Sequence, residues 1–91
     1  MESYKFYTLY LVEECPYCNR ALDLAKDSGI EYYAQFMDWE DPLLSEVKQK
    51  YEHQTVPVIV ETTVSEEQNI ERLIGGFTEF ETYMKKEGQN A

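Results

Sequence analysis

The two cysteines of this 91-residue chain are the residues whose type and spacing most plainly allow chemistry, and they occur in the sequence Cys15-Pro16-Tyr17-Cys18. If a helix begins directly after Cys15, the unpaired N–H groups of its first turn and the helix dipole stabilise a thiolate there. Cys18 then lies one turn further on, within reach of a disulfide formed at Cys15, and Pro16 stiffens the turn between them. The spacing therefore predicts that Cys15 is the attacking thiol and Cys18 the resolving thiol.

The same Cys-x-x-Cys spacing is also half of a zinc site. A structural zinc ion usually takes four Cys or His ligands, and this chain offers only Cys15, Cys18 and His53. His53 is expected near the end of a helix, where an exposed histidine commonly interacts with the helix terminus. We therefore predict no metal. A pair of inert buried cysteines is a second alternative, and it fits poorly with a motif at the start of a helix.

The elements that must position these thiols can be predicted from the pattern of apolar and turn residues. Strands are expected in segments rich in aromatic and β-branched residues, and these are residues 4–12, 30–37, 56–63 and 68–74. Helices are expected where apolar residues recur with helical spacing after a residue that favours a helix start. They cover residues 16–28, 42–51 and 78–84, with Asp41 and Thr78 as N-caps and Gly29 ending the first helix.

The order of these elements, β-α-β-α-β-β-α, predicts an α/β fold. Two strands joined by a helix should be parallel with a right-handed crossover, whereas the last two strands form a hairpin around a polar turn near residues 65–67. A four-stranded mixed sheet flanked by three helices follows. Because no repeat or Pro/Gly/Ser-rich linker interrupts the chain, residues 1–91 are expected to form a single domain.

The composition narrows the possible partners and the compartment. Eighteen acidic and eight basic residues give a net charge of −10, which argues against nucleic acid and anionic membranes. The acidic surface either serves solubility or steers the protein toward basic partners. Residues 6–12 are too short for a signal peptide and lack a preceding basic region. The expected location is cytoplasmic, where cysteines stay reduced unless they take part in redox turnover.

Three segments of the chain resemble, in order, the motifs of the dithiol glutaredoxin family: Cys15-Pro16-Tyr17-Cys18, Thr55-Val56-Pro57 and Gly75-Gly76-Phe77-Thr78-Glu79. The resemblance implies a thioredoxin-like fold and a thiol–disulfide oxidoreductase. It also implies glutathione as the reducing co-substrate and protein disulfides or glutathione-mixed disulfides as substrates. The partners implied are glutathione and disulfide-bearing or glutathionylated proteins, and the protein is expected to be a monomer.

The resemblance also implies a task for each motif. Pro57 would follow a cis peptide bond and so present the Val56 backbone to a bound peptide-like thiol. Thr78 and the N–H groups at the start of the last helix would hold a glutathione carboxylate, and Glu79 would accept its ammonium group. The residues implied to bind glutathione are Tyr17, Gln54, Thr55, Val56, Pro57, Gly76, Phe77, Thr78 and Glu79.

The chain departs from the family at two positively charged positions. Many glutaredoxins carry a lysine three residues before the first cysteine, where this chain has Val12, and a cation often stands where this chain has Gln54. Arg20 is the nearest obvious cation in the sequence. We therefore expect weak binding of glutathione, and improved binding when Val12 is replaced by lysine. The stretch between Pro57 and Gly75 is longer than the compact family pattern and is expected to extend the hairpin.

Two other functions remain open from the sequence. One is a redoxin that is reduced by thioredoxin reductase and dedicated to a single protein such as ribonucleotide reductase. The other is a binding module, in which a dimer holds an iron–sulfur cluster through Cys15 and glutathione and has little reductase activity. Pro16 beside Cys15 stiffens the turn and argues mildly against the cluster.

Overall fold

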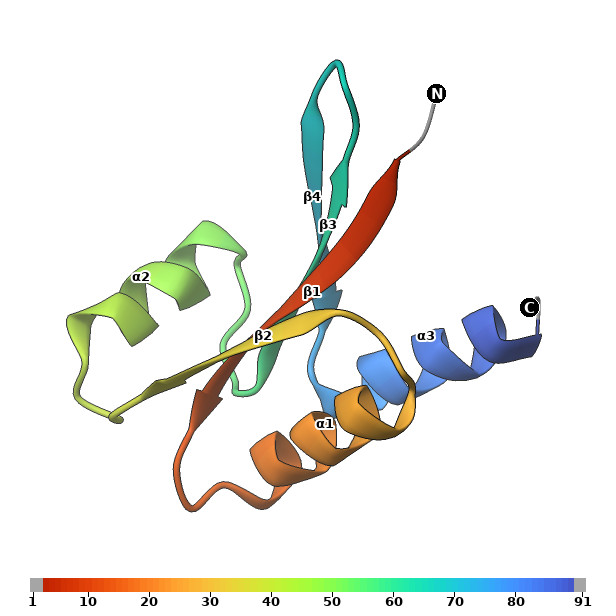
Figure 1. Ribbon diagram of the computed structural model, residues 1–91. Helices are drawn as coiled ribbons and strands as arrows, with labels where there is room; N and C mark the ends of the chain where they lie inside the picture. The colour runs from red at the N-terminus through yellow and green to blue at the C-terminus, as the bar shows by residue number, and fades with distance from the viewer. Residues whose placement is uncertain (1–2, 90–91) are drawn as a thin grey trace.

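The computed structural model describes residues 3–89, and the side chains of residues 3–86, with seven helices and strands (Figure 1). In chain order they are β1 (Tyr4–Val12), α1 (Pro16–Asp27), β2 (Tyr32–Met37), α2 (Pro42–Lys50), β3 (Val58–Val64), β4 (Asn69–Gly75) and α3 (Phe77–Gln89). This order confirms the predicted α/β succession. Within the described residues, no helix is both long and apolar enough to span a bilayer.

The four strands form one mixed sheet in the order β2-β1-β3-β4. β1 pairs with β2 in parallel, whereas the β1–β3 and β3–β4 pairs are antiparallel. Figure 1, in which the sheet is seen nearly edge-on, shows α2 on one side of it and α1 and α3 on the other. The expected four-stranded mixed sheet flanked by three helices is therefore confirmed, with β1 and β3 at its centre.

The core is split between the two faces of the sheet because successive strand residues point to opposite faces. Leu9 and Leu11 of β1 pack with Phe80 of α3 in the cluster that α1 and α3 cover. Val12 packs instead with Leu44 of α2 on the opposite face. β1 is thus buried on both faces at its carboxyl end, the end that leads into the Cys15 turn.

A buried carboxylate lies on the α3 face of the sheet. Glu61 of β3 is 3% exposed and accepts hydrogen bonds from the Tyr7 hydroxyl at 2.8 Å and the Tyr83 hydroxyl at 2.5 Å. The Lys5 ammonium nitrogen lies 3.8 Å from the same oxygen. These donors compensate the cost of removing a carboxylate from water and join α3 to the two central strands.

Two helix boundaries and the hairpin turn lie where local sequence signals predicted them. Asp41 is the N-cap of α2, where its carboxylate accepts the Leu43 N–H at 2.9 Å. Gly29 ends α1 with a left-handed φ of +68°, as expected of a glycine after a helix. The hairpin turn is closed by Ser65, whose backbone N–H and hydroxyl both donate to the Gln68 carbonyl. These three predictions are confirmed.

Several boundaries differ from the predictions, most clearly those of α3 and the start of β3. α3 begins at Phe77, so Thr78 lies inside its first turn and is not its cap; the helix also continues to Gln89, past the predicted end at Met84. The strand predicted from residue 56 begins only at Val58. The first two residues of the predicted strand, Val56 and Pro57, are joined by a peptide bond that is cis, as the resemblance implied. Proline also has no N–H group to donate to a neighbouring strand.

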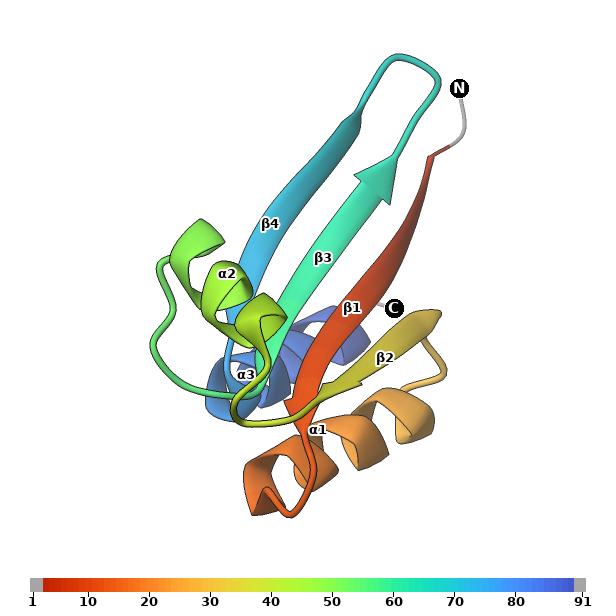
Figure 2. The ribbon, with the colours of Figure 1, turned by 90° about the vertical axis from the view of Figure 1, so that its left-hand side faces the viewer.

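The β3–β4 hairpin is long but lies away from the cysteines. Its turn is at the opposite end of the sheet from the carboxyl end of β1, as Figures 1 and 2 show. The strands pair from Ile59 with Gly75 to Val64 with Asn69, with one irregularity between Ile59 and Val60. The additional length therefore extends the hairpin without entering the site, as the sequence predicted.

Candidate active site

The turn between β1 and α1 places the first cysteine at the start of a helix. Cys15 is the N-cap of α1, and its Sγ atom accepts the Cys18 N–H at 3.2 Å. Glu14 before it has a positive φ of 59°, which turns the chain from the strand into the helix. The Cys18 N–H and the positive end of the α1 dipole thus lie beside the Cys15 sulfur. The local structure is therefore suited to a nucleophilic Cys15.

The second cysteine lies in a different environment. Both cysteines are free thiols in this structure, but Cys18 is 0% exposed whereas Cys15 is 7% exposed. Burial, with a smaller contribution from its hydrogen bond to Cys15, raises the pKa of Cys18 from 9.0 to about 12. Cys18 therefore remains a neutral thiol at neutral pH. This asymmetry is consistent with the predicted roles, in which Cys15 attacks and Cys18 acts later.

A groove beside the cysteines brings together segments that lie far apart in the sequence. This groove, the α1–α3 groove, has a volume of about 340 Å³. It is formed by α1, by the segment that leads into β3 and by the start of α3, and its lining residues are Tyr17, Thr55, Val56, Pro57, Gly76, Phe77, Thr78 and Glu79. Eight of the nine residues that the resemblance implied for glutathione thus line a single surface; the ninth, Gln54, does not.

A second groove adjoins the first and contains the thiol. This α2 groove has a volume of about 380 Å³ and is lined by Glu14, Cys15, Pro16, Trp39, Lys48, Gln54, Thr55 and Val56. Thr55 and Val56 line both grooves, so the two form adjacent parts of one surface around Cys15. Gln54 lies here, beside a lysine of α2 that the sequence analysis did not identify.

Lys48 and Arg20 are the cations that the fold brings to this surface. Lys48 lines the α2 groove together with Cys15. The Arg20 guanidinium carbon lies 5.4 Å from the centre of the Tyr17 ring, at the edge of the α1–α3 groove. Lys48 could have been proposed from the sequence, because it lies in the last turn of the helix that precedes Thr55. A positive charge is therefore available on each side of the site.

The structure buries Val12, the position at which a lysine is predicted to improve glutathione binding. Its side chain is 1% exposed and packs with Met37 and Leu44. A lysine there would replace a buried apolar side chain and would have to bury its stem or its charge, which is costly. The burial of Val12 therefore argues against the prediction that a lysine at this position would improve glutathione binding.

The start of α3 is held by a glutamate and by two glycines. The Glu79 carboxylate accepts the Gly76 N–H at 2.7 Å, which is one half of a capping box. Gly75 has a φ of +126°, and a Cβ atom there would lie 2.9 Å from Glu79 Cγ. The N–H groups of Phe77, Thr78 and Glu79 remain without intrahelical acceptors, as in the first turn of any helix. An anion can bind there, but Glu79 is already engaged in holding the helix start.

His53 lies closer to the site than the sequence indicated. Its Nε2 atom is 3.3 Å from the Thr55 hydroxyl and 3.7 Å from the position of a Cβ atom built on Gly76. It is therefore not merely an exposed residue at the end of α2. In residues 3–89, no group of three or more His, Cys, Asp or Glu side chains is arranged to hold a metal ion.

The fold and the site together define a class of protein. A mixed sheet of this topology, with a Cys-x-x-Cys pair at the start of α1 and a cis-proline before β3, is a thioredoxin-like fold. The family model for glutaredoxins matches residues 6–63, and the chain belongs to the glutaredoxin family. The match covers the first two motifs and ends before the segment from Gly75 to Glu79.

A solved structure shares this fold. The crystal structure of glutaredoxin 1 from Francisella tularensis, complexed with cacodylate, has a TM-score of 0.63 to this chain and is 24% identical to it. The superposition covers 90% of this chain and 94% of that one, so the shared fold extends over most of both chains. Comparison with curated protein sequences gave no match.

Proposed function

We propose that this protein is a glutathione-dependent thiol–disulfide oxidoreductase that reduces protein disulfides or glutathione-mixed disulfides. The observation that carries the proposal is the joint surface around Cys15. Eight of the nine residues implied for glutathione line one groove, and that groove shares Thr55 and Val56 with the groove that contains the thiol. A bound tripeptide can therefore lie beside Cys15.

The proposed reaction begins with attack of the Cys15 thiolate on the disulfide of a glutathionylated protein. A bond forms between the Cys15 sulfur and the glutathione sulfur, the original disulfide breaks, and the protein thiolate leaves and takes up a proton. A second glutathione, as its thiolate, then attacks the mixed disulfide. Oxidised glutathione leaves and the Cys15 thiolate is regenerated. One glutathione thiol is consumed in each cycle, and the disulfide bond passes from the protein to oxidised glutathione, whose other half comes from the substrate.

Cys18 enters when the substrate is a disulfide within or between proteins. After Cys15 has formed a mixed disulfide, Cys18 attacks the Cys15 sulfur, releases the reduced protein thiol and closes an intramolecular disulfide. Burial is the first cause of the raised pKa of Cys18. Cys18 must lose its proton as it attacks. We infer that glutathione resolves most mixed disulfides of this protein.

The charges around the site give glutathione an orientation. The helix start at Thr78 offers N–H donors and the positive end of the α3 dipole to one carboxylate. Lys48 and Gln54 in the α2 groove offer a cation and an amide to the other. The net charge of −10 slows the approach of an anionic thiol, so the affinity for glutathione should be low and sensitive to salt.

The proposal is tested by supplying electrons from two different sources. Turnover of a glutathionylated peptide is measured with glutathione, glutathione reductase and NADPH, and separately with thioredoxin reductase and NADPH. Efficient turnover in the first assay and little in the second is the expected result. Turnover only with thioredoxin reductase would support the redoxin that is dedicated to one protein. Visible absorbance of anaerobically purified protein without turnover in either assay would support the iron–sulfur module.

A further inference from the structure

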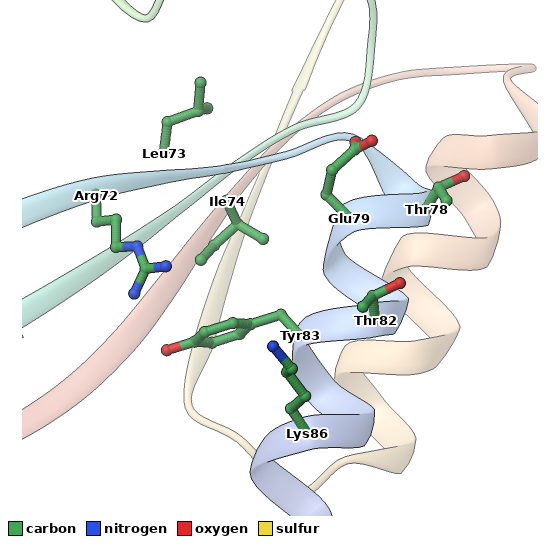
Figure 3. A pocket seen from close by; sticks show the side chains of 8 residues that line it. All are labelled: Arg72, Leu73, Ile74, Thr78, Glu79, Thr82, Tyr83 and Lys86. Carbon is green, nitrogen blue, oxygen red and sulfur yellow. The ribbon is translucent and has the colours of Figure 1, made fainter.

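A third groove lies between the edge strand β4 and α3. Its volume is about 310 Å³, and it is lined by Arg72, Leu73, Ile74, Thr78, Glu79, Thr82, Tyr83 and Lys86 (Figure 3). None of the residues beyond Thr78 and Glu79 was implied by the glutaredoxin motifs. The groove combines apolar side chains with three hydroxyl groups, two cations and the Glu79 carboxylate, a composition suited to a segment of polypeptide.

The two cations are placed by the fold and not by neighbouring positions in the sequence. Figure 3 shows Arg72 on β4 and Lys86 on α3, both pointing toward the Tyr83 ring. The Arg72 guanidinium carbon lies 5.4 Å from the centre of that ring. The Tyr83 hydroxyl donates to the buried carboxylate of Glu61, which fixes the ring beneath the guanidinium. The chain has eight basic residues and eighteen acidic ones. Two cations in one groove therefore contrast with the negative charge of the chain as a whole.

This β4–α3 groove continues from the α1–α3 groove. Thr78 and Glu79 line both. From there, Thr78, Thr82 and Lys86 follow one face of α3 at intervals of four residues, which corresponds to about 12 Å along the helix. An extended polypeptide covers this distance with about four residues. A chain joined to Cys15 through a disulfide can therefore pass Thr78 and reach Arg72 and Lys86.

We propose that the β4–α3 groove binds an acidic side chain of the protein substrate and thereby selects disulfide or glutathionylated proteins that carry Glu or Asp a few residues from the reactive cysteine. The inference rests on the proposed function and names the substrate class of the same site. Charge complementarity supports this occupant: Arg72 presents a planar guanidinium and Lys86 an ammonium, while Leu73 and Ile74 offer apolar contacts to the intervening residues. A nucleic acid would be repelled by the net charge of −10.

The test uses glutathionylated peptides with one cysteine and a single Glu placed three to six residues before or after it, each paired with a Gln version. kcat/KM is measured for the wild type, Arg72→Gln, Lys86→Gln and Lys85→Gln. Lys85 is the matched control because it is an exposed cation of α3 outside the groove. Glutathionylated free cysteine serves as the reference substrate without a peptide chain.

We expect the wild type to prefer the Glu peptide over the Gln peptide by about four- to twenty-five-fold at the best position, since each of the two exposed charge pairs contributes about two- to fivefold. Arg72→Gln and Lys86→Gln should each reduce this preference by at least half, and Lys85→Gln should leave it unchanged. Turnover of glutathionylated cysteine should be the same in all four proteins. High salt should remove most of the preference.

Three results would overturn the inference. One is an equal rate for the Glu and Gln peptides at every position. Another is an equal loss of preference in Lys85→Gln, which would indicate only long-range attraction. The third is a loss of turnover of glutathionylated cysteine in Lys86→Gln, which would place glutathione itself in the groove. Calorimetric binding of the same peptides with Ser in place of Cys gives a readout that needs no thiol chemistry. It therefore separates a failure of this inference from a failure of the proposed function.

Discussion

Lys48 should supply a positive charge for a glutathione carboxylate beside Cys15. The sequence has Val12 and Gln54 where related proteins often carry such a charge. Lys48 is half-buried in the last turn of α2 and lines the groove that contains the thiol and Gln54. A well-formed charge-assisted hydrogen bond contributes about 1.5–3 kcal/mol, whereas an exposed ion pair contributes about 0.2–1 kcal/mol. For a half-buried lysine we expect about 1 kcal/mol, which is about fivefold in affinity.

The assay is steady-state turnover against glutathione concentration for the wild type and Lys48→Gln at low and high ionic strength. Lys48→Gln should raise the KM for glutathione about fivefold at low salt and less at high salt, with a small change in kcat. Lys50→Gln is the matched control, because Lys50 lies in the same helix but points to Tyr51 and Glu71. Equal effects of the two substitutions, or none from Lys48→Gln, would refute the assignment of Lys48 to the site.

Three further predictions concern the structure that supports the site. Because folding raises the pKa of Cys18 from 9.0 to about 12, the stabilisation linked to this neutral thiol is complete below pH 9 and is lost as the pH rises toward 12. Denaturant unfolding at pH 7 and pH 10 should show a larger loss in the wild type than in Cys18→Ala, where only groups such as Tyr51, whose pKa is also raised, contribute. Glu61→Gln should lower the free energy of unfolding by about 1–3 kcal/mol, whereas the substitution of the exposed Glu71 by Gln should lower it by less than about 1 kcal/mol. Similar losses for the two variants in urea unfolding would contradict the importance of burial at Glu61. Gly75→Ala should be more destabilising in thermal unfolding than Gly29→Ala, because a Cβ atom at Gly75 meets the first turn of α3 at 2.9 Å and one at Gly29 meets nothing within 4 Å; the reverse order would contradict the close approach.

The elements that could be predicted from the sequence are those that local residues specify. Asp41 caps α2 with its own side chain and Gly29 ends α1 with a left-handed backbone, so neither boundary depends on distant contacts. The start of α3 was misplaced because Gly76, at the cap position, has no side chain to mark it. The capping interaction comes instead from Glu79, three residues later.

The site residues that belong to the three motifs could be predicted from the sequence, whereas those that only the fold brings to the site were not identified from it. Tyr17, Pro57 and Phe77 belong to the three motifs and meet in one groove. Lys48 in the last turn of α2 and His53 in the turn that follows it are brought to the site by tertiary structure, which composition and periodicity do not describe. The burial of Val12 also depends on tertiary structure, because it arises from packing against β2 and α2 on the second face of the sheet.

The two thiols give the most direct test of the proposed function. Cys15→Ser and Cys18→Ser are compared with the wild type in glutathione-dependent reduction of a glutathionylated peptide, coupled to glutathione reductase. Cys18→Ser keeps the backbone N–H that donates to the Cys15 sulfur at 3.2 Å, and this reaction needs only one thiol. We predict no turnover by Cys15→Ser and turnover within about threefold of the wild type by Cys18→Ser. Equal inactivity of both variants, or full activity of Cys15→Ser, would contradict the account.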